Sequence, residues 1–146
     1  MKKYVFICLL AVVALCWTGC ESNGPQFHKK TIDLKMTQND WQFDNQSGRF
    51  FCQFNMPEIT ESVYNYGSWT ISREYNYGTP NAYQVILPES SYYKEDVGNG
   101  NYAYYTQHID YVVGVGFVEI DYIISDFYYP AQFVPEAMNF RMQLVY

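Results

Sequence analysis

Apolar and polar residues alternate with a period of two along most of the chain from Thr31 onward. In residues 31–37, Ile32, Leu34 and Met36 alternate with polar neighbours, which is the pattern of a β-strand with one buried and one solvated face. Related patterns occur in six further segments, at residues 49–56, 68–75, 82–88, 101–114, 117–126 and 139–146. We therefore expect a mainly β fold of about seven strands, arranged as an antiparallel β-sandwich (Ig-like or a related meander).

Short polar and glycine-rich stretches separate these segments. After a brief continuation of the alternation at residues 40–44, Asn-Gln-Ser-Gly at 45–48 predicts a turn. Pro88 ends the fourth segment, and Gly-Val-Gly at 114–116 favours a hairpin turn. Residues 95–101 (Glu-Asp-Val-Gly-Asn-Gly-Asn) resemble a calcium loop but lack its terminal glutamate, so we expect the flexible tip of another hairpin there.

The segment at residues 68–75 carries one charge on its apolar face. Arg73 shares that face with Ile71 and Tyr75, because successive side chains of a strand point to opposite sides. We expect Arg73 to lie at a sheet edge, where its aliphatic stem can pack on the core while its guanidinium group reaches water.

Residues 56–67 (Met-Pro-Glu-Ile-Thr-Glu-Ser-Val-Tyr-Asn-Tyr-Gly) break the alternation. Pro57 suits a first helical position, and Gly67 suits a helix end. Ile59 and Val63 are four residues apart and can form a narrow apolar stripe. We expect one short helix between the second and third strands, packed on the sheet because so short a helix is not stable alone.

The first 19 residues have the organisation of an export signal. Two lysines near the start precede an apolar run from Tyr4 to Trp17, which is shorter than the ~20 residues of a membrane-spanning helix. The small residues Thr18 and Gly19 then precede Cys20. A plain secretory signal, in which Cys20 has no special role, is one interpretation of this pattern.

Trp-Thr-Gly-Cys at 17–20 resembles the lipobox of bacterial lipoproteins, with Trp17 where an aliphatic residue is usual. The resemblance implies that the Cys20 thiol accepts a diacylglyceryl group, that the chain is cut before Cys20, and that the new amino group is acylated, for example with palmitate. Several acyl chains anchor a protein stably, whereas one does so only marginally. We prefer this interpretation and expect Cys20 to be the first residue of a mature, lipid-anchored protein.

Three regions follow from these patterns. Residues 1–19 form a lipoprotein signal peptide, residues 20–30 the lipidated N-terminus with a flexible tether, and residues 31–146 a single β-rich domain. The Asn-Gly-Pro break at 23–25 and its polar surroundings favour a tether. Glu21 follows the cysteine in place of the aspartate that resembles an inner-membrane retention signal. We therefore expect an outer-membrane lipoprotein of the cell envelope, in the periplasmic or the surface-facing leaflet.

Charge and cysteine content exclude some classes of partner. The chain carries 9 basic and 15 acidic residues, for a net charge of -6. Its largest basic group is His-Lys-Lys at 28–30, so the surface repels phosphate backbones and a nucleic-acid partner is not expected. Of the 4 cysteines, only Cys52 remains free in the mature chain. Its aromatic neighbours favour a small buried apolar residue, and not a nucleophile.

Candidate catalytic residues are few. His108 and Asp110 lie two apart in one predicted strand, and Glu119 and Asp121 do so in the next, so each pair shares a face. Such pairs could serve base catalysis or glycoside hydrolysis, but alternation also produces them routinely on a solvated face. No second histidine is placed to complete a metal site, and no serine or cysteine has a nucleophile signature. We expect no catalytic residue, metal site or cofactor.

Tyrosine is unusually frequent, with 16 residues in the chain. Adjacent tyrosines cannot both point into the core of an extended segment. Some rings must therefore lie at the surface, where they can stack on sugars, anchor a protein partner or simply cover a sheet. The candidate ligand-binding tyrosines lie near two predicted loops and are Tyr92, Tyr93, Tyr104, Tyr105, Tyr128 and Tyr129.

Five longer segments carry a resemblance that covers nearly all of the chain from about Asp40 onward. They are FNMPEITESVYNYG at 54–67, VILP at 85–88, YTQHIDY at 105–111, FVEIDYIISDF at 117–127 and MNFRMQLVY at 138–146. In this pattern the chain is similar to a group of small, mostly uncharacterised outer-membrane lipoproteins of the Bacteroidetes type. The resemblance implies a lipid-modified cysteine and a β-rich fold, and it implies no active site.

These observations favour a membrane-anchored lipoprotein with a non-catalytic β-rich binding domain, whose ligand is a glycan or a surface protein. The alternative is a structural or assembly accessory of a cell-surface complex or fimbria-like system, in which exposed aromatic residues meet another protein's strand edge. A third hypothesis is a small hydrolase that uses His108, Glu119 or Asp121. The lack of a convergent catalytic set in the sequence favours the first hypothesis.

Overall fold

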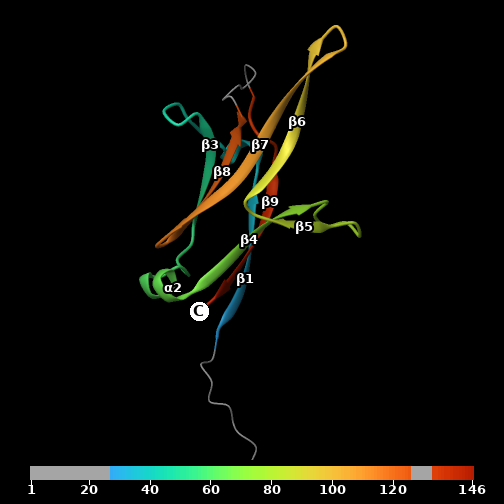
Figure 1. The fold of residues 1–146 in the computed structure, drawn as a ribbon. Coiled ribbons are helices and arrows are strands. Elements are labelled where there is room, and N and C mark those ends of the chain that lie inside the picture. The colour runs from blue at the N-terminus through green and yellow to red at the C-terminus, as the bar shows by residue number, and fades with distance from the viewer. Residues whose placement is uncertain (1–26, 126–132) are drawn as a thin grey trace, which may run out of the picture.

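The computed structural model describes residues 27–125 and 133–146, and Figure 1 shows their arrangement. Within these ranges the chain forms nine strands, one α-helix and one short 3-10 helix. In chain order they are β1 (Lys29–Met36), η1 (Gln38–Asp40), β2 (Gln42–Asp44), β3 (Arg49–Asn55), α2 (Glu61–Tyr66), β4 (Ser68–Tyr75), β5 (Tyr83–Ile86), β6 (Glu89–Gly98), β7 (Asn101–Gly114), β8 (Phe117–Ile124) and β9 (Met138–Val145).

The strands form two sheets. The four-stranded sheet has the order β1-β9-β4-β5, and the five-stranded sheet has the order β2-β3-β8-β7-β6. Every pairing within them is antiparallel. This architecture confirms the expected fold class, a mainly β antiparallel sandwich.

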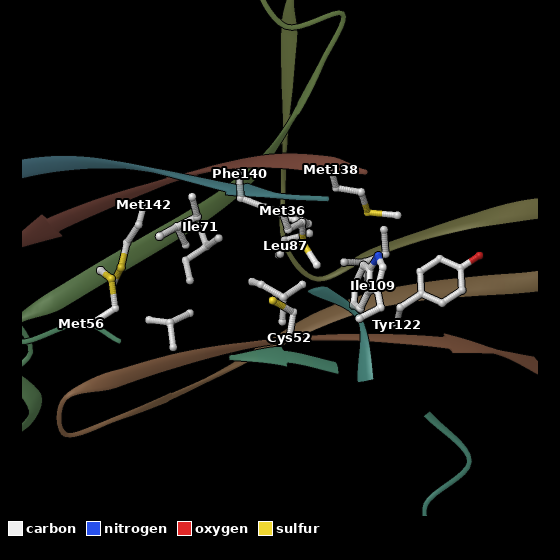
Figure 2. Close-up of a cluster of buried hydrophobic side chains, with 14 of the residues drawn as sticks. Met36, Cys52, Met56, Ile71, Leu87, Ile109, Tyr122, Met138, Phe140 and Met142 are labelled. Atoms are coloured by element: carbon white, nitrogen blue, oxygen red, sulfur yellow. The ribbon is translucent and has the colours of Figure 1, made fainter. Parts of the chain in front are cut away.

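Alternate residues of both sheets fill the core between them. In β9, Phe140, Met142 and Leu144 are fully buried, and in β8 so is Ile120. Figure 2 shows side chains of the two sheets directed toward one another, with Phe140 and Met142 in one layer and Cys52 in the other. Because burial of apolar surface is the dominant favourable term in folding, this shared layer stabilises both sheets at once.

Several strand boundaries follow the alternation closely. β4 and β7 span the predicted segments 68–75 and 101–114. β7 and β8 are joined by the expected hairpin turn, in which Gly114 pairs with Phe117. Gly116 has a φ of 82° in this turn, a left-handed conformation that glycine adopts without steric cost.

β6 is the strand that the sequence pattern does not predict. Its residues, Glu-Ser-Ser-Tyr-Tyr-Lys-Glu-Asp-Val-Gly, lack apolar alternation because β6 is an edge strand of the five-stranded sheet, where a polar sequence is tolerated. The glycine-rich stretch at 95–101 does form a hairpin tip, since Gly98 pairs with Asn101. With β2 as a separate strand, the described residues hold nine strands where about seven were expected.

α2 is the expected short helix, but it begins later than predicted. Thr60 is its N-cap, and the Thr60 hydroxyl accepts a hydrogen bond from the Val63 N–H at 3.3 Å. Pro57 therefore lies outside the helix, in a connection whose backbone is hydrogen-bonded to the β7–β8 turn instead of to a helical turn. The helix ends as expected at Gly67, whose N–H donates to the Val63 carbonyl at 2.8 Å.

The folded domain begins earlier than the predicted Thr31. The backbones of His28 and Tyr146 exchange two hydrogen bonds, of 2.7 and 3.0 Å, and Lys29 pairs with Val145 in the β1–β9 ladder. Lys29 and Lys30 thus belong to the sheet and not to a tether, and His28 is bonded at its end. Their polar side chains concealed this, because backbone pairing at an edge strand requires no apolar residue.

Candidate functional site

The β6–β7 hairpin carries four of the six candidate tyrosines. Tyr92 is 87% exposed and Tyr104 is 66% exposed. They lie on the outer face of the hairpin, where the register pairs Tyr92 with Thr106 and places Tyr104 at the adjacent position of that face. Tyr105 points to the opposite face and packs against the core, as the rule for adjacent residues requires, so it contributes no ring to the exposed face.

The other candidate positions lie outside what the structure describes. The side chain of Tyr93 and the whole of Tyr128 and Tyr129 are among these. Cys20, the predicted lipid attachment site, also precedes the described residues.

Tyr102 belongs to the same outer face and was not among the candidate positions. It is 46% exposed, and the Lys94 ammonium group lies over its ring, 3.5 Å from the ring centroid. The spacing of two residues between Tyr102 and Tyr104 was the signal that could have found it, since such residues share a face of a strand. We call Tyr92, Tyr102 and Tyr104 the tyrosine face.

The tyrosine face lies on the part of the hairpin that extends beyond the rest of its sheet. β8 pairs with β7 only from Gln107 onward, so residues 101–106 of β7 have β6 as their paired strand in the described part of the sheet. Figure 1 shows the β6–β7 hairpin extending past the other strands. The rings are therefore held on a paired backbone, and those of Tyr92 and Tyr104 are the most open to a ligand.

A second feature of the same sheet is a row of polar residues on its outer face. Ser90 of β6 lies opposite His108 of β7, and the Ser90 hydroxyl is 2.7 Å from His108 Nδ1. His108 Nε2 lies 3.7 Å from Asp110 Oδ2. His108 and Asp110 share a face as predicted, whereas Ser90 was found only through strand pairing.

The row continues through Arg49 of β3. Its Nη1 atom pairs with Glu119 at 2.8 Å and also with Asp121, which lies opposite Asp110 in the β7–β8 register. Burial raises the pKa of Asp121 above the usual carboxyl value; Arg49 opposes this shift, and Glu119 and Asp110 add to it. The structure therefore brings two of the candidate catalytic carboxylates, Glu119 and Asp121, to the guanidinium group of Arg49.

This polar row has the residue types of an acid–base site but an open geometry. The distance between His108 and Asp110 exceeds that of a hydrogen bond, and both side chains are 40% or more exposed. Within the described residues, no set of three histidine, cysteine, aspartate or glutamate side chains could hold a metal ion. Cross-strand pairs of this kind stabilise a sheet, and that is the role the contacts support.

The position of Arg73 differs from the sheet edge that the sequence predicted. β4 lies between β9 and β5, so Arg73 is not at a sheet edge and is only 6% exposed. Its guanidinium group donates to the Tyr75 hydroxyl at 2.8 Å and to Glu136 at 3.0 Å, and it lies 3.9 Å from Glu89. Tyr75 in turn donates to Glu89. Burial and this bond to Glu89 raise the pKa of Tyr75 far above its usual value.

Cavities lie on both sides of this network. One of about 250 Å³ is lined by Arg73, Tyr75 and Glu136, among others. Another, of about 340 Å³, lies over the outer face of the four-stranded sheet. There Glu74 accepts from Gln84 at 2.9 Å, and its second carboxylate oxygen is buried with no hydrogen-bond partner. Both are shallow features of a strand surface, and neither gathers the predicted residues.

A further cavity, of about 500 Å³, lies next to residues 133–138. Its polar lining is already bonded, since the Tyr122 hydroxyl donates to Gln107 at 2.9 Å and Gln38 donates to the Val134 carbonyl at 3.2 Å. These bonds occupy the polar side chains of Tyr122, Gln107 and Gln38 in the cavity lining.

Cys52 has the properties of a buried apolar residue. It is a free, buried cysteine in β3, and burial raises the pKa of its thiol to about 11. A nucleophilic cysteine needs a lowered pKa and access to solvent, so Cys52 packs as the sequence analysis expected.

Comparison of the chain with protein-family models, with curated proteins and with solved structures found no match. Among the residues that the structure describes, no helix is long and apolar enough to cross a bilayer.

Proposed function

We propose that this chain is an outer-membrane lipoprotein, anchored through lipid on Cys20, whose β-sandwich domain binds a glycan without catalysing a reaction. The leader pattern at 1–19 and the lipobox-like Trp-Thr-Gly-Cys support the anchor. The resemblance to small lipoproteins of the Bacteroidetes type supports the same location. The ligand-binding part of the proposal rests on the tyrosine face.

One observation carries the binding hypothesis. Tyr92, Tyr102 and Tyr104 place three rings on one face of a projecting hairpin, all of them 46% or more exposed. Tyrosine buries a large apolar area while its hydroxyl keeps a hydrogen-bonding partner. A sugar presents the matching combination, an apolar ring face edged by hydroxyl groups. The neighbouring Lys94 and Asp96, on the same face, add polar contacts.

Retention of the detergent-solubilised, full-length protein on glycan arrays and polysaccharide affinity gels tests this binding. We expect retention by at least one polysaccharide, and its loss in a Tyr92→Ser, Tyr104→Ser double variant. Tyr66→Ser is the matched control, because Tyr66 is also 87% exposed but lies on α2. If the protein migrates in every polysaccharide gel as it does in a gel without polysaccharide, and no array glycan retains it, a glycan ligand is excluded.

The anchor has its own test. We expect intact-mass analysis of the detergent-extracted protein to show a chain that begins at Cys20 and carries added lipid mass. A Cys20→Ser variant should leave the membrane fraction. An unmodified chain, or a Cys20→Ser product that stays with the membranes after correct cleavage, would contradict the anchor and leave the glycan test unaffected.

A protein partner is the second candidate, and the position of β6 at the edge of its sheet, among the strands that the structure describes, favours it. β6 is ten residues long and lies at the end of its sheet in the order β2-β3-β8-β7-β6. A strand edge of this length can pair with a strand of another protein, as an accessory of a surface complex or fimbria-like system would require. Photo-crosslinking from position 94 on membranes, followed by pull-down, tests this; recovery of background proteins alone would count against it.

A further inference from the structure

Three chain segments meet at one end of the sandwich. β1 begins there, β9 ends there and β4 begins there, because Val145 pairs with Lys29 on one side and with Ser68 on the other. α2 directly precedes β4. Figure 1 shows α2, the C-terminus and the start of β1 together at this end, opposite the tip of the β6–β7 hairpin.

This end exposes a group of aromatic side chains. Phe27 is 73% exposed and Tyr66 is 87% exposed, and Tyr64 and Tyr146 are each 43% exposed. Trp69 stacks on Tyr64, with ring centroids 6.0 Å apart and planes at 19°. We call Phe27, Tyr64, Tyr66, Trp69 and Tyr146 the aromatic end. Rings of this kind are among the most costly residues to leave in water.

The aromatic end lies close in sequence to the predicted anchor. Residues 21–28 alone separate Cys20 from the first residue of β1. Even fully extended, a segment of this length spans roughly 25–30 Å. A lipid on Cys20 would therefore keep the start of β1, and with it α2, within that distance of the bilayer.

We propose that the aromatic end docks on the surface of the bilayer that holds Cys20. This inference rests on the lipid anchor of the proposed function. Tyrosine and tryptophan prefer the membrane–water interface, where the ring enters the headgroup region and the polar atom stays hydrated. The tether brings this end, and not the hairpin tip, to the lipid. Docking leaves the tyrosine face turned away from that bilayer and open to a ligand.

Charge does not drive this contact. Lys30 is paired with Glu58 at 2.9 Å, and Glu61 in the first turn of α2 is a further acidic side chain of this end of the molecule. Attraction to anionic lipid needs a cluster of about four or more lysines or arginines. The basic group at this end is His28, Lys29 and Lys30, and Lys30 is already paired. Docking through rings should therefore occur on zwitterionic lipid and should change little with salt.

Depth-dependent fluorescence quenching tests the proposal on the full-length lipidated protein in phosphatidylcholine vesicles. A thiol-reactive fluorophore is placed at Tyr66→Cys and, as the matched control, at Tyr92→Cys. Lipid on Cys20 and burial of Cys52 leave the introduced thiol as the reactive one. We expect a lipid-borne nitroxide to quench the label at 66 severalfold more than the label at 92, with the reverse order for aqueous iodide, at low and at high salt.

Equal quenching at both positions in vesicle-bound protein would overturn the proposal, as would a label at 66 that neither quencher reaches, which indicates a protein cover. Failure of the protein to bind vesicles would instead contradict the lipid anchor. A second measurement uses a label at Glu61→Cys. Tyr64→Ser with Tyr66→Ser should abolish its nitroxide quenching, whereas Tyr92→Ser with Tyr104→Ser should leave it intact. Unchanged quenching in the first double variant would also overturn the proposal.

Discussion

At the scale of single residues, buried charge is the most demanding feature of this sandwich. The Arg73 guanidinium group is buried in β4 and contacts Tyr75, Glu89 and Glu136. A charge in the protein interior is stable only when its hydrogen-bonding groups are satisfied, because it has lost its hydration. The Glu89 carboxylate also depends on Arg73. Its Oε1 atom accepts from Tyr75, but its Oε2 atom is buried without a hydrogen-bond partner among the described residues and lies 3.9 Å from Arg73 Nη1.

Replacement of Arg73 should therefore be strongly destabilising. We expect Arg73→Met to lower the free energy of unfolding by about 3 kcal/mol, because Glu89 stays buried without its cation. Lys30→Met is the control: it removes an ion pair at the surface and should change this free energy by less than about 1 kcal/mol. Urea denaturation of both variants measures the difference, and similar losses would contradict a special role for the buried network.

Cys52 makes a prediction that depends on pH. Because the pKa of its thiol is raised to about 11, only about one thousandth of it is thiolate at pH 8, and that fraction rises about tenfold per pH unit up to the pKa. We expect slow labelling of the native protein by a thiol reagent at pH 8 and rapid labelling in urea. Fast labelling without denaturant, at a rate independent of pH between 8 and 10, would contradict this environment.

At the scale of elements, the β7–β8 turn has two roles. It joins two central strands of the five-stranded sheet, and its Gly116 also binds the connection that leads to α2. The Met56 N–H donates to the Gly116 carbonyl at 2.7 Å, and the Gly116 N–H donates to the Ile59 carbonyl at 2.8 Å. The start of the helix is thus set by a turn far away in the sequence.

Gly116 should accordingly resist substitution. Its φ of 82° lies in a region where a β-carbon costs about 1 kcal/mol, so Gly116→Ala should destabilise the protein by about that amount. Gly116→Asn should cost less, because asparagine tolerates the left-handed conformation. The midpoints of chemical denaturation would show this order. An alanine variant as stable as the wild type would mean that the turn changes conformation at no cost.

At the scale of the whole molecule, a continuous core connects two ends with different surfaces. Trp41 lies near one end, where its indole N–H donates to the Glu136 carbonyl at 3.0 Å. Trp69 lies near the other, paired with Leu144 in the β4–β9 register. Between these two tryptophans, β9 contributes fully buried residues to the core that the two sheets share. We therefore expect the tyrosine face and the aromatic end to unfold as one cooperative unit.

Single-tryptophan variants test this cooperativity. We expect Trp41→Phe, which leaves Trp69 as the reporter in the mature domain, and Trp69→Phe, which leaves Trp41, each to show one unfolding transition. Within each variant, its midpoint should match that of far-ultraviolet circular dichroism, because one core couples the two ends. Fluorescence at Trp69 that changes before the circular dichroism signal would indicate separate unfolding of the α2 end.

Local pattern by itself determined the strands at 68–75 and 101–114, the turn at 114–116 and the opposite directions of Tyr104 and Tyr105. Each of these depends on neighbours within a few residues, because alternation of side chains is a property of the extended backbone. The mainly β class follows from the same pattern. So does the shared face of His108 and Asp110.

Tertiary structure alone decided the rest. The strands that flank β4 determine whether Arg73 lies at a sheet edge or is buried. The pairing of β6 with β7 brings Ser90 to His108. The tertiary structure also makes the polar segment 89–98 a strand, through pairing with β7, and places α2 beside the start of β1. Strand order joins residues that are far apart in the chain through backbone hydrogen bonds, which are available to every residue except proline. Side-chain pattern along one segment therefore carries little information about its partner.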